Sequence, residues 1–212
     1  LRDRDGDGVA EERFLFLEKQ WQPFGMALVG DTFYVGNTDA LLTFDYKDGA
    51  TKLEGPTAKL MDFKPGGHWT RSLLLSPDNT KLYAGVGSLS NIGDDGMEAE
   101  QGRACIYEID LKTGSSRIFA GGFGDETPPD YLTSVQDGGF YGWPYCYWGQ
   151  TVDERVAQDA SMVAKAIRPD YALGGHTASL GLCWLPEGTL PGFGAGMAIG
   201  QHGSWNRSTL SG

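Results

Sequence analysis

Hydrophobic residues occur along this chain in short runs that polar turns separate. In the first quarter, apolar runs at residues 26–29, 32–35 and 41–46 are joined by short turns such as Gly30-Asp31. Runs of this length with tight connections are typical of antiparallel β-strands. The pattern predicts a three-stranded meander.

A second group of apolar runs extends this arrangement to four strands. Its members lie at residues 72–75, 81–86, 104–109 and 117–120. Four antiparallel strands in succession form one blade of a β-propeller. The long connection at residues 87–103 is glycine-rich and acidic, and it is either a solvated loop or a lid over a site.

The pattern changes once beyond residue 150. Apolar residues within 154–167 recur close to the helical period and Pro169 ends the segment, which predicts one short surface helix. Runs at 180–185 and 197–199 return to strand-like lengths.

Glycine-flanked loops precede several of these runs. A Gly-Gly-His loop at residues 66–68 leads into one run, and a second Gly-Gly-His loop lies at residues 174–176. Residues 23–28 also run from a turn-prone loop into an apolar run and form a weaker repeat of this unit. The units at residues 23–28 and 66–68 are spaced by about 40–50 residues, the length of a propeller blade. We therefore predict an all-β fold, a β-propeller of four-stranded antiparallel blades that is incomplete in this chain, as a single domain over residues 1–212.

The composition agrees with a turn-rich β protein, and the net charge disfavours some classes of binding partner. The chain of 212 residues contains 32 glycines and 10 prolines, and its net charge is −11 with no basic cluster. Nucleic acid and anionic membrane surfaces are excluded as partners because either would be repelled. No apolar stretch of about 18 residues exists, so no membrane span is expected. The chain opens on Leu1 without a signal-like segment, as a mature or trimmed chain would.

The cysteine count is odd. Cys105, Cys146 and Cys183 leave at least one thiol unpaired within the chain. Buried, small hydrophobic side chains are the expected role, and Cys105 and Cys183 fall in predicted strands where burial is easy.

Alternating carboxylates near the start resemble half of a calcium-binding loop. Asp3, Asp5 and Asp7 are followed by Gly8, whereas the twelfth position of that pattern is Phe14. The segment is a calcium site at the three aspartates or a solvated acidic turn.

All three histidines lie in glycine-flanked loops at predicted strand ends: His68, His176 and His202. A neutral imidazole, with a pKa of about 6.5, can take a proton from a substrate hydroxyl at neutral pH. His68 is the first choice for a general base, and a loop hydrogen bond to backbone is the alternative. Their spacing does not favour a zinc site, and no dinucleotide-binding fingerprint is present.

Two further features could contribute to a binding site. Arg71 and Arg207 stand beside strand ends, where a guanidinium could hold a cofactor carboxylate bidentately or lie on the surface. Six aromatic residues within 138–148 could form a wall for a flat or sugar-like ligand, or a structural corner.

Several motifs together resemble one known family. They are Asp-Gly-Asp-Gly at 5–8, Gly-His-Trp-Thr-Arg at 67–71, Pro-Asp-Tyr-Leu-Thr-Ser-Val at 129–135, Gly-Phe-Tyr-Gly-Trp-Pro-Tyr at 139–145, His-Thr-Ala at 176–178 and His-Gly-Ser-Trp-Asn-Arg at 202–207. With them the chain resembles the sorbosone dehydrogenase branch of the soluble quinoprotein sugar dehydrogenases, which are β-propellers that use pyrroloquinoline quinone (PQQ) and calcium.

The resemblance implies a mechanism and a set of site residues. A histidine, matched here by His68, removes a proton from a sugar hydroxyl or an aldehyde hydrate, and hydride passes to the quinone, whose carbonyl calcium polarises. The implied cofactor-binding residues are Arg71, Trp143, His176, Thr177, Asn206 and Arg207. The implied metal ligands are Asp3, Asp5 and Asp7.

The chain also departs from the family pattern. An Arg-Asn-Pro loop and an Asn-Glu-Arg-Asp stretch are absent between Gly122 and Phe123, so a segment is missing there relative to the family. The first blade and the last strands of the family are absent as well.

These observations predict a quinoprotein oxidoreductase that oxidises a sugar or sugar-derived aldehyde, sorbosone-like or aldose-like, by hydride transfer to PQQ. An electron acceptor would be its second partner, and the resemblance implies a periplasmic or secreted location. The alternative is a non-catalytic β-propeller that binds a carbohydrate or protein partner.

Overall fold

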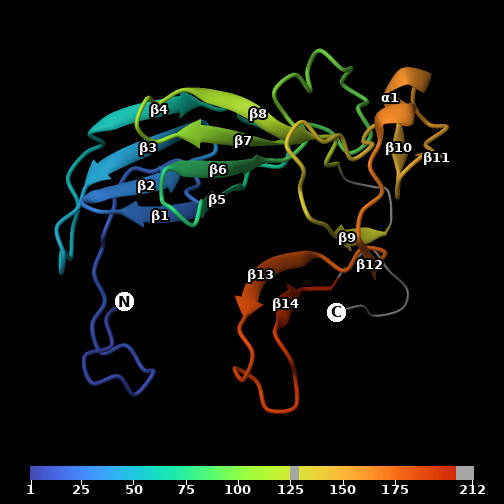
Figure 1. Cartoon of the computed structure of the whole chain (residues 1–212). Coiled ribbons are helices and arrows are strands. Elements are labelled where there is room, and N and C mark those ends of the chain that lie inside the picture. The colour runs from blue at the N-terminus through green and yellow to red at the C-terminus, as the bar shows by residue number, and fades with distance from the viewer. Residues whose placement is uncertain (125–128, 204–212) are drawn as a thin grey trace. The chain divides into compact units, whose positions relative to one another are not determined.

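A computed structural model describes residues 1–124 and 129–203 of the chain (Figure 1). It divides into two compact units, Leu1–Phe123 and Gly124–Gly212. The division falls next to the position, between Gly122 and Phe123, where the sequence departs from the family pattern. The prediction of a single domain over residues 1–212 stays a prediction.

The first unit contains two four-stranded antiparallel sheets, each paired in chain order. The first sheet consists of β1 (Gly25–Val29), β2 (Thr32–Gly36), β3 (Ala40–Asp45) and β4 (Ala58–Asp62). The second consists of β5 (Arg71–Leu75), β6 (Lys81–Val86), β7 (Cys105–Asp110) and β8 (Ser116–Gly121). The prediction of an all-β fold with four-stranded antiparallel sheets is confirmed.

The sequence pattern missed β4 and therefore predicted three strands for the first sheet. The strand reads Ala-Lys-Leu-Met-Asp, without a β-branched or aromatic residue. It lies at the sheet edge and pairs with β3 through a register shift between Leu41 and Leu42. Pairing with an established strand, not local propensity, makes this segment extended.

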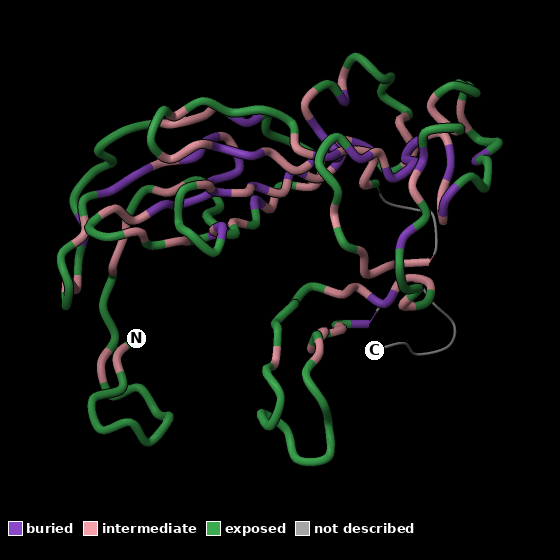
Figure 2. The backbone as a smooth tube through the Cα atoms, in the orientation of Figure 1, coloured by how far each residue is buried: buried purple, intermediate pink, exposed green. Residues whose placement is uncertain are grey.

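One face of each sheet packs against the other sheet. Along β6, buried residues alternate with half-buried ones, so Leu82, Ala84 and Val86 share one face and enter the core with Leu41 and Ile109. Figure 2 shows the buried segments along the inner strands of this unit. Burial of these side chains is the main stabilising term for the stacked sheets.

The first strands of the two sheets approach closely. A Cβ on Gly25 would lie 2.3 Å from the Arg71 carbonyl oxygen, and one on Gly36 would lie 2.7 Å from the same atom. Gly25 and Gly36 face each other in the β1–β2 register. Glycine at both positions therefore allows β1 and β2 to pack against the start of β5.

The described residues of the second unit, 124 and 129–203, form short antiparallel pairs and one helix. The pairs join β9 (Asp130–Leu132) to β12 (Tyr171–Gly174), β10 (Cys146–Tyr147) to β11 (Thr151–Val152), and β13 (Ser179–Leu185) to β14 (Gly196–Gln201). The predicted helix is present as α1 (Ala160–Lys165), capped by Asp159, whose side chain accepts hydrogen bonds from Ser161 N and Met162 N. The strands β9 to β12 have two to four residues each, too few to leave a hydrophobic period in the sequence.

The three cysteines are free thiols. Cys105 and Cys146 are buried, and burial raises the pKa of Cys105 to about 11, so this thiol is protonated at neutral pH. The expected burial of Cys183 is wrong: it is exposed on β13, which pairs with β14 alone. Within the described part of the chain, no helix is long and apolar enough to cross a membrane.

Candidate active site

His68 lies on the connector between β4 and β5, at the end of the sheets where three connectors meet. Because successive strands reverse direction, the β2–β3, β4–β5 and β6–β7 connectors emerge at one end. Thr38 Oγ1 donates a hydrogen bond to Trp69 O at 3.0 Å, and His68 N donates to Ser88 O at 3.1 Å. These contacts tie the three connectors together.

The imidazole of His68 contacts Ser88 through its Nδ1 atom. Its Nδ1 lies 2.9 Å from Ser88 O and 3.1 Å from Ser88 Oγ. A carbonyl oxygen only accepts, so a neutral ring in this contact carries its proton on Nδ1 and its lone pair on Nε2. The alternative role, a loop hydrogen bond to backbone, is therefore present, and the general-base role stays a prediction. In this tautomer Nε2 carries the basic lone pair.

Two glycines shape the space around His68. A Cβ on Gly87 would lie 2.5 Å from His68 Cβ, and one on Gly67 would lie 2.1 Å from Leu89 O. Gly67 also has φ of 54°, a conformation that side chains disfavour. The position of His68 thus depends on glycine in its own connector and in the β6–β7 loop.

Arg71, at the start of β5, is completely buried. Its Nη1 donates to His68 O at 2.8 Å and Thr70 O at 2.9 Å, and its Nη2 donates to Lys64 O at 3.0 Å. Burial, followed by the charge of Arg103, lowers the pKa of Arg71 to about 10. The surface-arginine alternative is wrong. Contact with a cofactor carboxylate stays a prediction, which the existing bonds to carbonyls do not favour.

The sequence pattern assigned no role to Arg103, which lies in the β6–β7 loop two residues before β7. Its side chain is 5% exposed and donates to the carbonyls of the two connectors that surround His68. The acceptors are Gly87 O, Lys64 O, Pro65 O, Gly66 O, His68 O and Ser88 O. The available signal was a cation directly before an apolar run, as for Arg71.

A buried carboxylate organises the β6–β7 loop. Glu100 is 4% exposed and accepts from Leu89 N at 2.7 Å, Ser90 N at 2.9 Å and Ser90 Oγ at 2.7 Å. The loop therefore folds around an internal acceptor, and its role as a lid stays a prediction.

In the second unit, the turn after β12 carries His176 and Thr177. Asp130 Oδ2 accepts from Thr177 N at 2.7 Å, Thr177 Oγ1 at 2.9 Å and Ala178 N at 3.0 Å. His176 and Ala178 have φ of 54° and 47°, so this turn is held in a conformation that costs free energy. Thr177 is buried and His176 is half-buried, which leaves the imidazole as the more accessible group.

The aromatic segment supports the second unit from inside. Trp143 is 5% exposed and packs against Gly124, where a Cβ would meet the indole ring at 1.8 Å. Tyr141 is buried and its hydroxyl donates to Ser134 O at 2.8 Å. For these two side chains the structural-corner alternative describes the geometry, and contact of Trp143 with a cofactor stays a prediction.

The remaining predicted residues have different surroundings. His202 is exposed, with Nδ1 3.1 Å from Gly203 O. Asn206 and Arg207 lie outside the described residues. His68 and Arg71 belong to the first unit, and Trp143, His176 and Thr177 to the second.

The N-terminal acidic segment folds into a cluster of four carboxylates. Side-chain oxygens of Asp3, Asp5, Asp7 and Glu11 all lie within 4.8 Å of one another, and all four residues are exposed. Asp3 accepts from the backbone of Gly8 and Gly6, which lowers the pKa of its carboxyl group. The sequence analysis considered only the three aspartates, because Glu11 comes too early for the calcium-loop pattern. This oxygen-only donor set fits a hard cation such as calcium.

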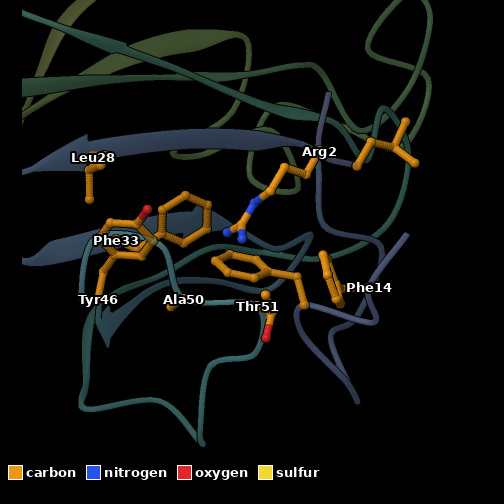
Figure 3. A pocket seen from close by; sticks show the side chains of 9 residues that line it. Arg2, Phe14, Leu28, Phe33, Tyr46, Ala50 and Thr51 are labelled. Atoms are coloured by element: carbon orange, nitrogen blue, oxygen red, sulfur yellow. The ribbon is translucent and has the colours of Figure 1, made fainter. Parts of the chain in front are cut away.

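A separate pocket of about 370 Å³ lies beside the N-terminal segment (Figure 3). Its lining combines apolar and aromatic side chains with one guanidinium: Leu1, Arg2, Phe14, Phe16, Leu28, Phe33, Tyr46, Ala50 and Thr51. Arg2 lies over the Phe14 ring at 5.6 Å and donates to Gly49 O at 2.9 Å. No residue predicted for the site lines this pocket, so it is not the proposed site of proton transfer.

Stacked four-stranded antiparallel sheets, with a histidine held at the end where their connectors meet, define a β-propeller-like protein with a candidate proton-transfer site. The model of the TrAA12-like family matches residues 2–122, more than half of the chain. The chain belongs to this family.

Several solved structures have a similar fold. The iodide structure of the Trichoderma reesei carbohydrate-active enzyme of family AA12 aligns with a TM-score of 0.72 at 18% identity, over 89% of this chain and 63% of that chain. The calcium structure of the T. reesei protein gives 0.71 at 19% identity, over 89% and 63%. The holo form of the PQQ domain of pyranose dehydrogenase from Coprinopsis cinerea gives 0.66 at 20% identity, over 89% and 62%.

The chain therefore spans less than two thirds of the length of each of these structures. A curated relative, an uncharacterized protein of Borreliella burgdorferi, is 26% identical over 169 residues, which cover 67% of this chain and 44% of that protein. The structural likeness confirms the fold.

Proposed function

We propose that the protein is a quinoprotein oxidoreductase that oxidises a sugar with PQQ and calcium. The observation that carries the proposal is the His68 imidazole, fixed through Nδ1 at the end where three connectors meet. Membership of the TrAA12-like family and the likeness to a PQQ domain of pyranose dehydrogenase support the cofactor. The likeness to a calcium structure of family AA12 supports the metal.

In this mechanism the neutral His68 ring acts as the general base. Nε2 accepts the proton of a substrate hydroxyl, or of an aldehyde hydrate, while Nδ1–H continues to donate to Ser88 O. The carbonyl dipole of Ser88 stabilises the positive charge that forms on the ring. Bound PQQ would accept the hydride that leaves the substrate carbon.

The residues proposed to hold the cofactor differ in how well they fit that role. His176 is half-buried at a turn, whereas Thr177 is buried with its Oγ1 donating to Asp130, and Trp143 is packed in the interior. We assign the direct contacts of the second unit to His176, and those of the C-terminal motif to Asn206 and Arg207. Thr177 and Trp143 support these contacts.

The substrate class is a pyranose, an aldose or sorbosone. Trp69 directly follows His68, is 40% exposed, and packs edge-to-face with Phe24 at 6.2 Å between ring centroids. An exposed aromatic pair beside the base offers an apolar surface to a sugar ring.

We further propose that Asp3, Asp5, Asp7 and Glu11 bind calcium and that the protein is secreted or periplasmic.

Dye reduction by the full-length protein tests this proposal. Protein is incubated with PQQ and calcium and is then offered a panel of pyranoses, aldoses and sorbosone. We expect turnover that requires both additions and depends on the sugar. Saturable sugar binding without turnover would instead support the non-catalytic propeller.

A further inference from the structure

Two buried arginines from different parts of the first unit share their acceptors. Lys64 O accepts from Arg71 Nη2 at 3.0 Å and from Arg103 Nη1 at 2.6 Å. His68 O accepts from Arg71 Nη1 at 2.8 Å and from Arg103 Nη2 at 3.2 Å. The connector that carries His68 is therefore held at both ends by both guanidinium groups.

Arg103 also reaches the group that orients the His68 ring. Its Nη2 donates to Ser88 O at 2.8 Å, the same oxygen that lies 2.9 Å from His68 Nδ1. Its Nε donates at 2.8 Å to the carbonyl oxygen of Gly87, the glycine that leaves room for His68. One planar side chain thus fixes the histidine connector and the strand end against which the imidazole rests.

The nearby charge of Glu100 offsets the charge of Arg103 in part, without a direct ion pair. Among the described residues, neither guanidinium forms a salt bridge with a carboxylate, and the oxygens of buried Glu100 bond to Leu89 and Ser90. Burying two like charges is costly, and burial lowers the pKa of both groups. Charge-assisted bonds to carbonyls are shorter and stronger than neutral ones, and five donors in a fixed plane impose one geometry on their acceptors.

We infer that Arg71 and Arg103 form a clamp that positions the imidazole of His68 and selects the tautomer with its proton on Nδ1. Arg71 fixes the connector through Lys64 O and His68 O, and Arg103 also fixes Ser88 O. Both are positioning residues. The structural part of the inference is independent of the proposed function, and its kinetic consequence rests on that function.

The tautomer can be measured without cofactor or substrate. The 212-residue chain has only three histidines, so ¹⁵N-histidine NMR of this chain resolves them, and His176→Gln and His202→Gln variants assign the signals. At a pH where the rings are neutral, we expect protonated Nδ1 for His68 in the wild type. Arg103→Lys removes the planar fork and should give a mixture with Nε2–H.

The matched control is Arg117→Lys, because Arg117 is bonded to Glu108 in the same sheet, away from His68. It should leave the His68 signals unchanged. Arg71→Lys, which alters fewer bonds, is measured in parallel because Arg103→Lys can also lower stability. Unchanged Nδ1 protonation in the folded lysine variants would overturn the clamp.

Kinetics supply the second readout. Misplacing a base should reduce kcat by about 10- to 100-fold in Arg103→Lys while KM stays within about threefold. Arg117→Lys should keep both constants. An equal loss of kcat in Arg103→Lys and in the control Arg117→Lys would indicate a general structural effect and contradict the clamp. Absence of turnover in the wild type would refute the proposed function, and the NMR result would still decide the clamp.

Discussion

At the scale of single residues, the space for His68 is created by what Gly87 lacks. A Cβ at this position would lie 2.5 Å from His68 Cβ, far inside normal contact. Gly87 has no positive φ that would itself exclude alanine, so contact with His68 is the constraint. The glycine in the β6–β7 loop therefore belongs to the candidate site although it carries no chemistry.

Gly87→Ala should displace the histidine connector. We expect a loss of about 1–3 kcal/mol in the free energy of unfolding, the usual cost of overpacking, measured by urea denaturation. Gly55→Ala is the control, because a Cβ there would have open space and should leave stability nearly unchanged. Equal stability of the two variants would contradict the described packing.

The sequence pointed to the residues that are proposed to carry the chemistry of the site. It did not point to the residues that hold them in position. His68 could be selected because a histidine between a glycine loop and an apolar run is an informative pattern. Ser88 acts on His68 through its own backbone carbonyl, and the side chains of Arg103 and Asp130 bond mainly to backbone atoms. A backbone carbonyl has no residue identity, so nothing in the sequence marks which side chain will bind it.

At the scale of elements, strands were predictable where hydrophobic alternation and turns agreed. The pattern of β6 and its neighbours in the second sheet gave bounds within one residue of the structure. The edge strand β4 and the short pairs of the second unit were missed because tertiary pairing, not local periodicity, defines them.

Glu108 links three strands of the second sheet and gives that element a pH dependence. Burial opposes its ionisation, but bonds from Lys81 at 3.0 Å, Arg117 at 3.0 Å and Tyr83 at 3.1 Å outweigh burial and lower its pKa. A carboxylate with a lowered folded pKa adds stability above its unfolded pKa, and this stability is lost as pH falls through the folded value.

We therefore expect the thermal unfolding midpoint to fall as pH drops below about 4.5, the ordinary value for a glutamate. Glu108→Gln should reduce the slope of the midpoint against pH in this acid range. Calorimetry at a series of pH values measures both. An unchanged slope in the variant would contradict the role of Glu108.

The acidic N-terminal loop is the second element with a testable property. If Asp3, Asp5, Asp7 and Glu11 bind calcium, Asp5→Asn should weaken binding by about 10-fold or more, because it removes one charged ligand. Asp48→Asn, at an exposed position outside the cluster, should have no effect. Isothermal titration calorimetry with calcium chloride gives the dissociation constants. Identical calcium affinities of wild type and Asp5→Asn would contradict a calcium site at this cluster.

At the scale of the whole molecule, the fold and the family agree while the chain spans only part of its relatives. Two stacked four-stranded sheets, the match of the TrAA12-like model over residues 2–122 and a TM-score of 0.72 point to one β-propeller-like architecture. The sequence motifs resemble those of quinoprotein sugar dehydrogenases, in line with the TrAA12-like family, whereas the sorbosone branch stays a prediction. Substrate choice depends on loop shape, which short motifs do not encode.

The central claim is that His68 is the base of a PQQ-dependent oxidation, and one comparison tests it most directly. Full-length wild type, His68→Ala and His202→Ala are loaded with PQQ and calcium, and dye reduction is followed with the best sugar. We predict a 10²–10⁴-fold loss of kcat, as is typical for a general base, in His68→Ala alone, with an unchanged circular dichroism spectrum. A folded His68→Ala variant that turns over the sugar at the wild-type rate would contradict the account.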